Sequence, residues 1–224
     1  AKKIGINSIN KFFNFNNIHS LKRKIKNVDL IVGSNVFCHV PNQVNLIKAI
    51  DVLLKKNGTL IFEEPYLGSM YEKISYDQIY DEHIYMFSLS SVEKIYKLFN
   101  FELVDAIPQE THGGSMRYII KRKNITKKSK RLIKLMANER KKNIDKFSGC
   151  ISFKKKVEKS KILLREKIRN IIKRGEKICG YGATSKSTTI LNYCNINNKI
   201  IDCIFDTTPD KIGKLSPGSH IPIV

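Results

Sequence analysis

Short runs of β-branched and aromatic residues alternate, in the first half of the chain, with segments whose apolar residues recur at helical spacing. Residues 28–32 and 59–62 are such runs and predict two strands, and the segment 44–54 between them predicts a helix. The basic residues and glycine at 55–58 predict the end of this helix, with Gly58 as its C-cap. Because 28–32 is rich in β-branched residues, we expect a parallel strand that is buried on both faces.

The same alternation continues to about residue 124. Residues 90–99, after Ser88, predict a helix, and residues 101–106 and 117–121 predict two strands joined by a long turn at 111–114. The order of elements is therefore strand, helix, strand, helix and a final antiparallel pair. We expect an α/β domain over residues 1–124.

The composition changes between residues 125 and 174, where long basic helices are predicted. An apolar stripe at helical spacing is formed by Val157, Leu164, Ile168, Ile171 and Ile172. The stripe is short and its polar face is ordinary, so a helical connector is favoured over a coiled coil or an RNA-binding helix. Residues 175–224 then predict the start of a second α/β domain.

A glycine turn in this second domain predicts a phosphate site. Residues 176–179 predict a strand that runs into the turn, and Gly182 allows a tight passage from strand to helix. Backbone amides at the start of that helix would face an anion, with hydroxyls from Thr184 and Ser185 and the ammonium of Lys186 as further donors. A glycine turn without a ligand is the structural alternative.

A second predicted strand, 200–205, ends at Asp206. This acid lies about 20 residues beyond the glycines, at the position where dinucleotide folds place a ribose-binding acid. From these residues alone, residues 175–224 could be part of a nicotinamide-dinucleotide-binding domain. An NAD-dependent oxidoreductase is therefore one alternative function.

Residues 76–83 combine phenol, carboxylate and imidazole groups after the second predicted strand. Tyr80, Glu82 and His83 provide the groups needed for proton transfer, because imidazole titrates near neutral pH and a phenol can donate to a developing enolate oxygen. Asn35 and His39 follow the first strand, at the strand ends where open α/β sheets bind ligands. A structural role for His39 is equally compatible with the sequence.

The overall composition excludes some classes of protein and leaves others open. The net charge of +21 suits nucleic acid, but the lysines accompany many asparagines and isoleucines throughout the chain, as an A/T-rich coding sequence would produce, so a nucleic-acid-binding protein is disfavoured. The five cysteines contain no C-x-x-C pair and predict neither a disulfide framework nor a zinc knuckle. No apolar run is long enough to span a bilayer, and we expect a cytoplasmic protein.

Four motifs in order resemble the S-adenosylmethionine-dependent C-methyltransferases of deoxysugar biosynthesis, which include C-3 methyltransferases. The motifs are Asn-Val-Phe-Cys-His-Val-Pro at 35–41, Phe-Glu-Glu-Pro-Tyr-Leu-Gly at 62–68, Tyr-Asp-Glu-His at 80–83 and His-Gly-Gly-Ser-Met-Arg-Tyr at 112–118. The resemblance implies the second half of a class I methyltransferase Rossmann-like domain, a connector and the start of a C-terminal Rossmann-like domain. It also implies a nucleotide-linked 4-keto sugar as substrate.

The resemblance assigns roles to individual residues. His83 would remove a proton from the sugar carbon, Tyr80 and His39 would stabilise the enolate oxygen, and Glu82 would support the base. Asn35 would lie near S-adenosylmethionine. Gly182, Thr184, Ser185, Lys186 and Asp206 would bind the substrate. Family members begin with a zinc-binding domain and a glycine loop for S-adenosylmethionine, so we expect this chain to be a fragment and zinc to belong to the part before it.

Overall fold

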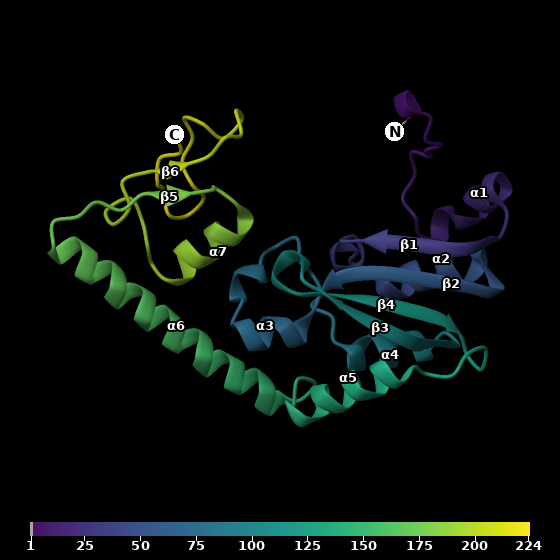
Figure 1. The fold of residues 1–224 in the computed structure, drawn as a ribbon. Coiled ribbons are helices and arrows are strands. Elements are labelled where there is room, and N and C mark those ends of the chain that lie inside the picture. The colour runs from purple at the N-terminus through teal and green to yellow at the C-terminus, as the bar shows by residue number, and fades with distance from the viewer. Residues whose placement is uncertain (1) are drawn as a thin grey trace. The chain divides into compact units, whose positions relative to one another are not determined.

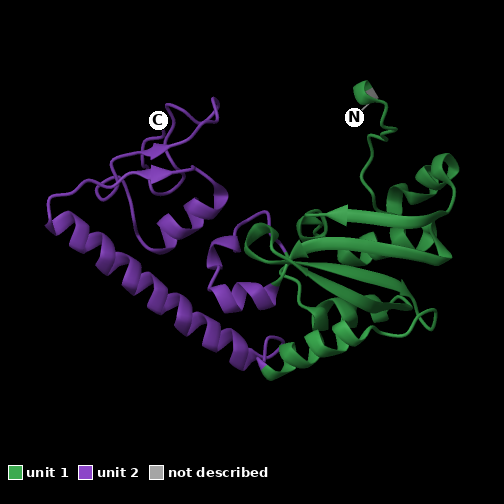
Figure 2. Cartoon of the chain, viewed as in Figure 1, with its two compact units in different colours: residues 1–66, 85–141 green, residues 67–84, 142–224 purple. Residues whose placement is uncertain are grey.

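The computed structural model describes residues 2–224, which form two compact units (Figure 2). Unit 1 comprises residues 1–66 and 85–141, and unit 2 comprises residues 67–84 and 142–224. Residues 67–84 therefore lie outside unit 1 and belong to unit 2 with the C-terminal part of the chain. Within the described part, no helix is both long and apolar enough to cross a bilayer.

Unit 1 is built on a four-stranded mixed sheet (Figure 1). The strand order is β1-β2-β4-β3, in which β1 and β2 run parallel and the other two pairs are antiparallel. This confirms the predicted α/β class and the predicted antiparallel pair at the end. The strands are β1 (Val28–Ser34), β2 (Leu54–Pro65), β3 (Phe101–Gln109) and β4 (Ser115–Arg122).

The core of unit 1 is aromatic. Phe62 on β2 is fully buried and stacks on Phe37 and Tyr118, with ring centroids 4.6 and 4.7 Å away. The predicted helix after Ser88 is confirmed, because the Ser88 hydroxyl accepts a hydrogen bond from the Ser91 amide and caps it. The helices of this unit are α1 (Phe15–Ile25), α2 (Gln43–Leu53), α4 (Leu89–Lys97) and α5 (Lys130–Lys141), with short 3-10 turns η1 (Lys2–Ile4), η2 (Phe37–His39) and η4 (Thr111–Gly113).

Two local predictions for unit 1 are wrong. Gly58 is no helix C-cap, because α2 ends at Leu53 and the basic segment after it is already part of β2. Strand β1, at one edge of the described sheet, is not buried on both faces: Leu30 and Val32 remain 51 and 66% exposed. Pairing between strands distant in sequence, which local patterns do not report, decides the first outcome.

Unit 2 combines helices with a minimal sheet. Its strands β5 (Gly180–Tyr181) and β6 (Ile204–Phe205) pair in parallel. The predicted strands over 176–179 and 200–205 are therefore displaced or shortened to two residues, whereas the predicted long basic helix is confirmed. The helical elements are α3 (Leu67–Lys73), η3 (Tyr76–Gln78), α6 (Phe147–Lys173) and α7 (Ser185–Tyr193).

Candidate functional site

A histidine in unit 2 is fixed in one tautomer by its neighbours. Nδ1 of His83 lies 2.9 Å from the carbonyl oxygen of Gln78, and Nε2 lies 2.8 Å from the hydroxyl of Tyr80. Because a carbonyl can only accept, the Nδ1 atom carries the proton of the neutral ring and Nε2 accepts from Tyr80. The arrangement leaves the basic nitrogen directed at a phenol, so a base and a hydrogen-bond donor lie side by side.

The glycine turn of unit 2 is held by a carboxylate on the neighbouring strand end. Asp206, directly after β6, accepts from the amides of Ala183 and Thr208 at 2.7 and 2.8 Å and from the ammonium of Lys211 at 3.2 Å. The hydrogen bonds from Thr208, with those from Ala183 and Lys211, lower the pKa of Asp206. Gly182 lies at φ 86°, a conformation that suits glycine.

The helix that follows this turn begins with a reciprocal cap. The Thr184 hydroxyl accepts from the Ser187 amide at 3.1 Å, and the Ser187 hydroxyl accepts from the Thr184 amide at 2.9 Å. The first turn of α7 is therefore ordered without a ligand. It presents several hydroxyl groups next to the positive end of the helix dipole.

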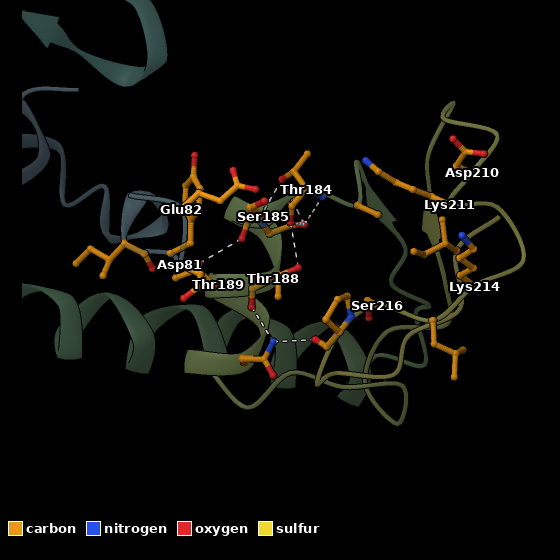
Figure 3. A pocket seen from close by; sticks show the side chains of 18 residues that line it. Asp81, Glu82, Thr184, Ser185, Thr188, Thr189, Asp210, Lys211, Lys214 and Ser216 are labelled. Carbon is orange, nitrogen blue, oxygen red and sulfur yellow. Dashed lines mark hydrogen bonds between the residues drawn. The ribbon is translucent and has the colours of Figure 1, made fainter. Parts of the chain in front are cut away.

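A cavity of about 740 Å³ lies within unit 2 against this helix. Figure 3 shows Glu82 and Asp81 at one end of it, the hydroxyl groups of α7 in the middle, and Lys211 and Lys214 at the other end. Asp210 lies at the same end as the two lysines, so that end carries both signs of charge. A cavity with hydroxyl groups beside ammonium groups suits a ligand that carries anionic groups and sugar hydroxyls. The polar lining residues include Tyr80, Asp81, Glu82, Thr184, Ser185, Ser187, Thr188, Thr189, Asp210, Lys211, Lys214 and Ser216.

The predicted substrate-binding residues are divided by this geometry. Thr184 and Ser185 line the cavity, together with Tyr80 and Glu82 from the predicted catalytic segment. Gly182, Lys186 and Asp206 are not among the lining residues that the structure describes, and the oxygens of Asp206 are engaged by the loop itself. The cavity instead includes Lys211 and Lys214, which the sequence interpretation did not single out as binding residues.

Two further predicted residues lie in unit 1, in the segment after β1. The backbone of Asn35 has φ 51°, and its side-chain nitrogen Nδ2 lies 3.3 Å from Nε2 of His112. His39 ends the 3-10 turn η2. The segment is anchored by Glu64, whose Oε1 accepts from the amides of Val36 and Phe37 at 2.8 and 2.6 Å.

The sequence interpretation missed the anchoring role of Glu64. This side chain is fully buried at the end of β2, next to Glu63, which is only partly buried and pairs with Arg117 at 2.9 Å. Burial and the neighbouring Glu64 carboxylate raise the pKa of Cys38. Two adjacent glutamates in a strand point to opposite faces, and that alternation is the signal by which one of them could have been assigned to the interior.

Two family models match successive parts of the chain. Residues 110–224 match the family model described as a C-methyltransferase C-terminal domain, and residues 3–106 match the model of a methyltransferase domain. The chain is 29% identical over 195 residues to the C-methyltransferase NovU of Streptomyces niveus. This match covers 87% of the chain but 46% of NovU, so the chain spans about half the length of that relative.

Solved structures similar to this chain include methyltransferases. A SAM-dependent methyltransferase from Anabaena variabilis has a TM-score of 0.35 and 17% identity, with 49% of this chain and 55% of that chain covered. The N-methyltransferase NodS from Bradyrhizobium japonicum has a TM-score of 0.30 and 17% identity, with 43 and 51% covered.

Proposed function

Because the chain belongs to the family of C-methyltransferase C-terminal domains, we propose that it is part of an enzyme that methylates a carbon atom of a nucleotide-linked 4-keto-deoxysugar. The carbon would be the one next to the keto group, where a proton is acidic enough for removal by a protein base. The pairing of His83 with Tyr80 is the observation that supports this reaction most directly, since it combines a base with an acid.

The proposed reaction begins with proton removal by His83. The Nε2 atom of His83 is the unprotonated nitrogen, and its bond to Gln78 through Nδ1 keeps the ring oriented while Nε2 gains a proton. The electron pair of the broken C–H bond moves into the enolate. On substrate binding the Tyr80 hydroxyl would leave Nε2 of His83 and donate to the enolate oxygen instead. The resemblance gives His39 the same role and Glu82 that of supporting the imidazolium.

S-adenosylmethionine, when it is bound, supplies a methyl group on a positively charged sulfur. Asn35 is the residue of this chain that we assign to its binding. The Asn35 side chain is partly exposed at the carboxyl end of β1, and an amide there can both donate and accept hydrogen bonds. We propose that Asn35 helps to hold this cofactor. The family resemblance implies further cofactor contacts outside the segment 1–224.

The cavity of unit 2 would bind the nucleotide diphosphate of the substrate. The hydroxyl groups of Thr184 and Ser185 at the start of α7 would donate to phosphate oxygens, and the helix dipole favours negative charge there. The ammonium groups of Lys211 and Lys214 at the far end of the cavity add positive charge. Lys186, on the same helix, would add to the positive field around the anion rather than line the cavity.

The test is methyl transfer by the full-length protein, with isotopically labelled S-adenosylmethionine and a panel of nucleotide-linked 4-keto-deoxysugars. We expect acid-stable label on sugar carbon, and a loss of about 100-fold or more in kcat for His83→Ala, because general bases contribute factors of this order. His19→Ala, at an exposed position on α1, is the matched control and should keep full activity.

Each alternative function has a distinct result in the same series. Unlabelled sugars together with hydride transfer from a nicotinamide cofactor would replace the methyltransferase proposal by the oxidoreductase alternative. Equal labelling by wild type and His83→Ala would keep the methyltransferase and remove His83 from the role of base. Steep salt-dependent binding to random RNA, without methyl transfer, would favour a nucleic-acid-binding protein.

A further inference from the structure

Two cysteines that are distant in the sequence lie together at the base of the glycine turn. Cys179 directly precedes β5 and Cys203 directly precedes β6, and their sulfur atoms are 3.6 Å apart. Both are free thiols; Cys179 is exposed and Cys203 is partly exposed. The cysteine spacing in the sequence does not indicate this pair, because its members are 24 positions apart.

The strand register explains why the two thiols meet. Gly180 pairs with Ile204 and Tyr181 with Phe205, so Cys179 and Cys203 occupy the preceding position on each strand. The amide of Gly180 donates to the carbonyl of Cys203 at 2.8 Å, which continues the pairing to that position. Neighbouring strands lie about 4.8 Å apart, within the range of about 4.4–6.8 Å between the Cα atoms of disulfides. A rotation of the two side chains therefore suffices to bring the sulfurs to bonding distance.

We propose that Cys179 and Cys203 are a modification site that forms a reversible intrachain disulfide by exchange with a small disulfide of the glutathione class. The thiolate of Cys179 attacks one sulfur of the small disulfide, breaks its S–S bond and releases one thiolate. The thiolate of Cys203 then attacks the Cys179 sulfur of the mixed disulfide and releases the second. Two protein thiols are oxidised, one small disulfide is reduced to two thiols, and the two protein protons pass to the released thiolates.

The order of these two steps follows from the surroundings of the thiols. Cys179 is the more exposed of the two and meets an external disulfide first. Cys203 is only partly exposed, which makes it the less accessible first nucleophile. Once Cys179 is in the mixed disulfide, Cys203 is the neighbouring thiol that attacks its sulfur and resolves it.

The other cysteines provide internal controls. Cys38 and Cys194 are buried, and Cys150 is exposed on α6 with the Tyr71 hydroxyl 3.1 Å from its sulfur. An external disulfide should therefore modify Cys150 as a glutathione adduct, because no second thiol is described beside it. The Cys179–Cys203 bond would close a loop that contains the whole glycine turn and α7, and would tie β5 to β6 directly below that turn.

The experiment is incubation of the reduced chain with glutathione disulfide, alkylation of the remaining thiols and peptide mapping by mass spectrometry. We expect the loss of two thiols through a cross-linked peptide pair containing Cys179 and Cys203, with recovery on addition of dithiothreitol. Cys150→Ser should retain the cross-link. Cys179→Ser and Cys203→Ser should lose it and leave the remaining partner as a glutathione adduct.

The wild-type map alone decides the proposal, so it does not depend on the folding of any variant. Separate glutathione adducts on Cys179 and Cys203, without a cross-link, would overturn it. It would equally be overturned if Cys150 reacts to completion while both thiols of the pair remain free. A cross-link that also forms in fully urea-unfolded protein at the same rate would show that the fold does not promote it, and would overturn it as well.

Discussion

The two units solve the same structural problem in different ways. In each, a loop follows the first strand of a parallel pair, and a carboxylate at the end of the second strand accepts hydrogen bonds from that loop's amides. In unit 1 the carboxylate is Glu64, which binds the amides of Val36 and Phe37. In unit 2 it is Asp206, which binds the amide of Ala183.

The difference lies in what else surrounds the two carboxylates. Glu64 is fully buried, and no ion pair to it is found among residues 2–224. Asp206 has an ammonium group at 3.2 Å, from Lys211, which also lines the cavity. The loop of unit 1 is therefore fixed as part of a hydrophobic core, whereas the loop of unit 2 is held by a polar network that a bound anion or a change of pH can reach.

The largest effect is expected from Glu64→Ala. The substitution leaves two amides near the core without their acceptor and opens a cavity, so we expect a loss of about 3 kcal/mol in the unfolding free energy of unit 1. Urea unfolding followed by circular dichroism measures it. Glu64→Gln keeps one acceptor oxygen and should lose less than half as much, and Glu110→Ala, at an exposed position of the same unit, is the control. Equal stability of Glu64→Ala and Glu110→Ala would contradict the anchoring role.

The sequence predicted best those features that neighbours along the chain decide. The helix capped by Ser88 and the helix α7 capped by Thr184 depend on residues three positions apart, and both form. Gly58 was assigned wrongly because it lies within strand β2, which pairs on either side of it with β1, a strand distant in the sequence. The alternation of Glu63 and Glu64 along a strand can assign one of them to the interior. The partner amides of Glu64, however, lie 27 and 28 residues earlier in the chain, where local patterns cannot identify them.

The next largest effect is expected at acid pH and concerns the stability that Asp206 gives to the glycine turn of unit 2. Hydrogen bonds from Thr208, Ala183 and Lys211 lower the pKa of Asp206. Its contribution to stability is therefore complete above the unfolded pKa of about 3.9 and is lost as the pH falls through the lower folded pKa. Amide hydrogen exchange at Ala183 should be insensitive to the charge of Asp206 from about pH 8 to 5, after correction for the intrinsic exchange rate.

The variant Asp206→Asn tests this assignment. It should raise the corrected exchange rate of Ala183 severalfold near neutral pH. It should also abolish the further rise in that rate which the wild type shows when acid protonates Asp206, because the titrating group is gone. The exposed Asp145→Asn in the same unit should behave as wild type. If Asp206→Asn keeps the acid transition of the wild type, another group controls the turn.

The smallest effect on the fold is expected from Lys211→Met, and it tests whether the polar network of unit 2 serves a ligand. The Lys211 side chain is more than a third exposed, and ion pairs at such sites contribute little, so exchange at Ala183 should change less than twofold. Binding of a nucleoside diphosphate, measured by calorimetry at low salt, should weaken by about tenfold, since a charged hydrogen bond to phosphate would be lost. Lys199→Met, at an exposed position outside the cavity lining, is the matched control for net charge. If Lys211→Met and Lys199→Met bind the nucleotide equally well, Lys211 serves Asp206 alone, and the polar anchor of unit 2 would be as purely structural as the buried one of unit 1.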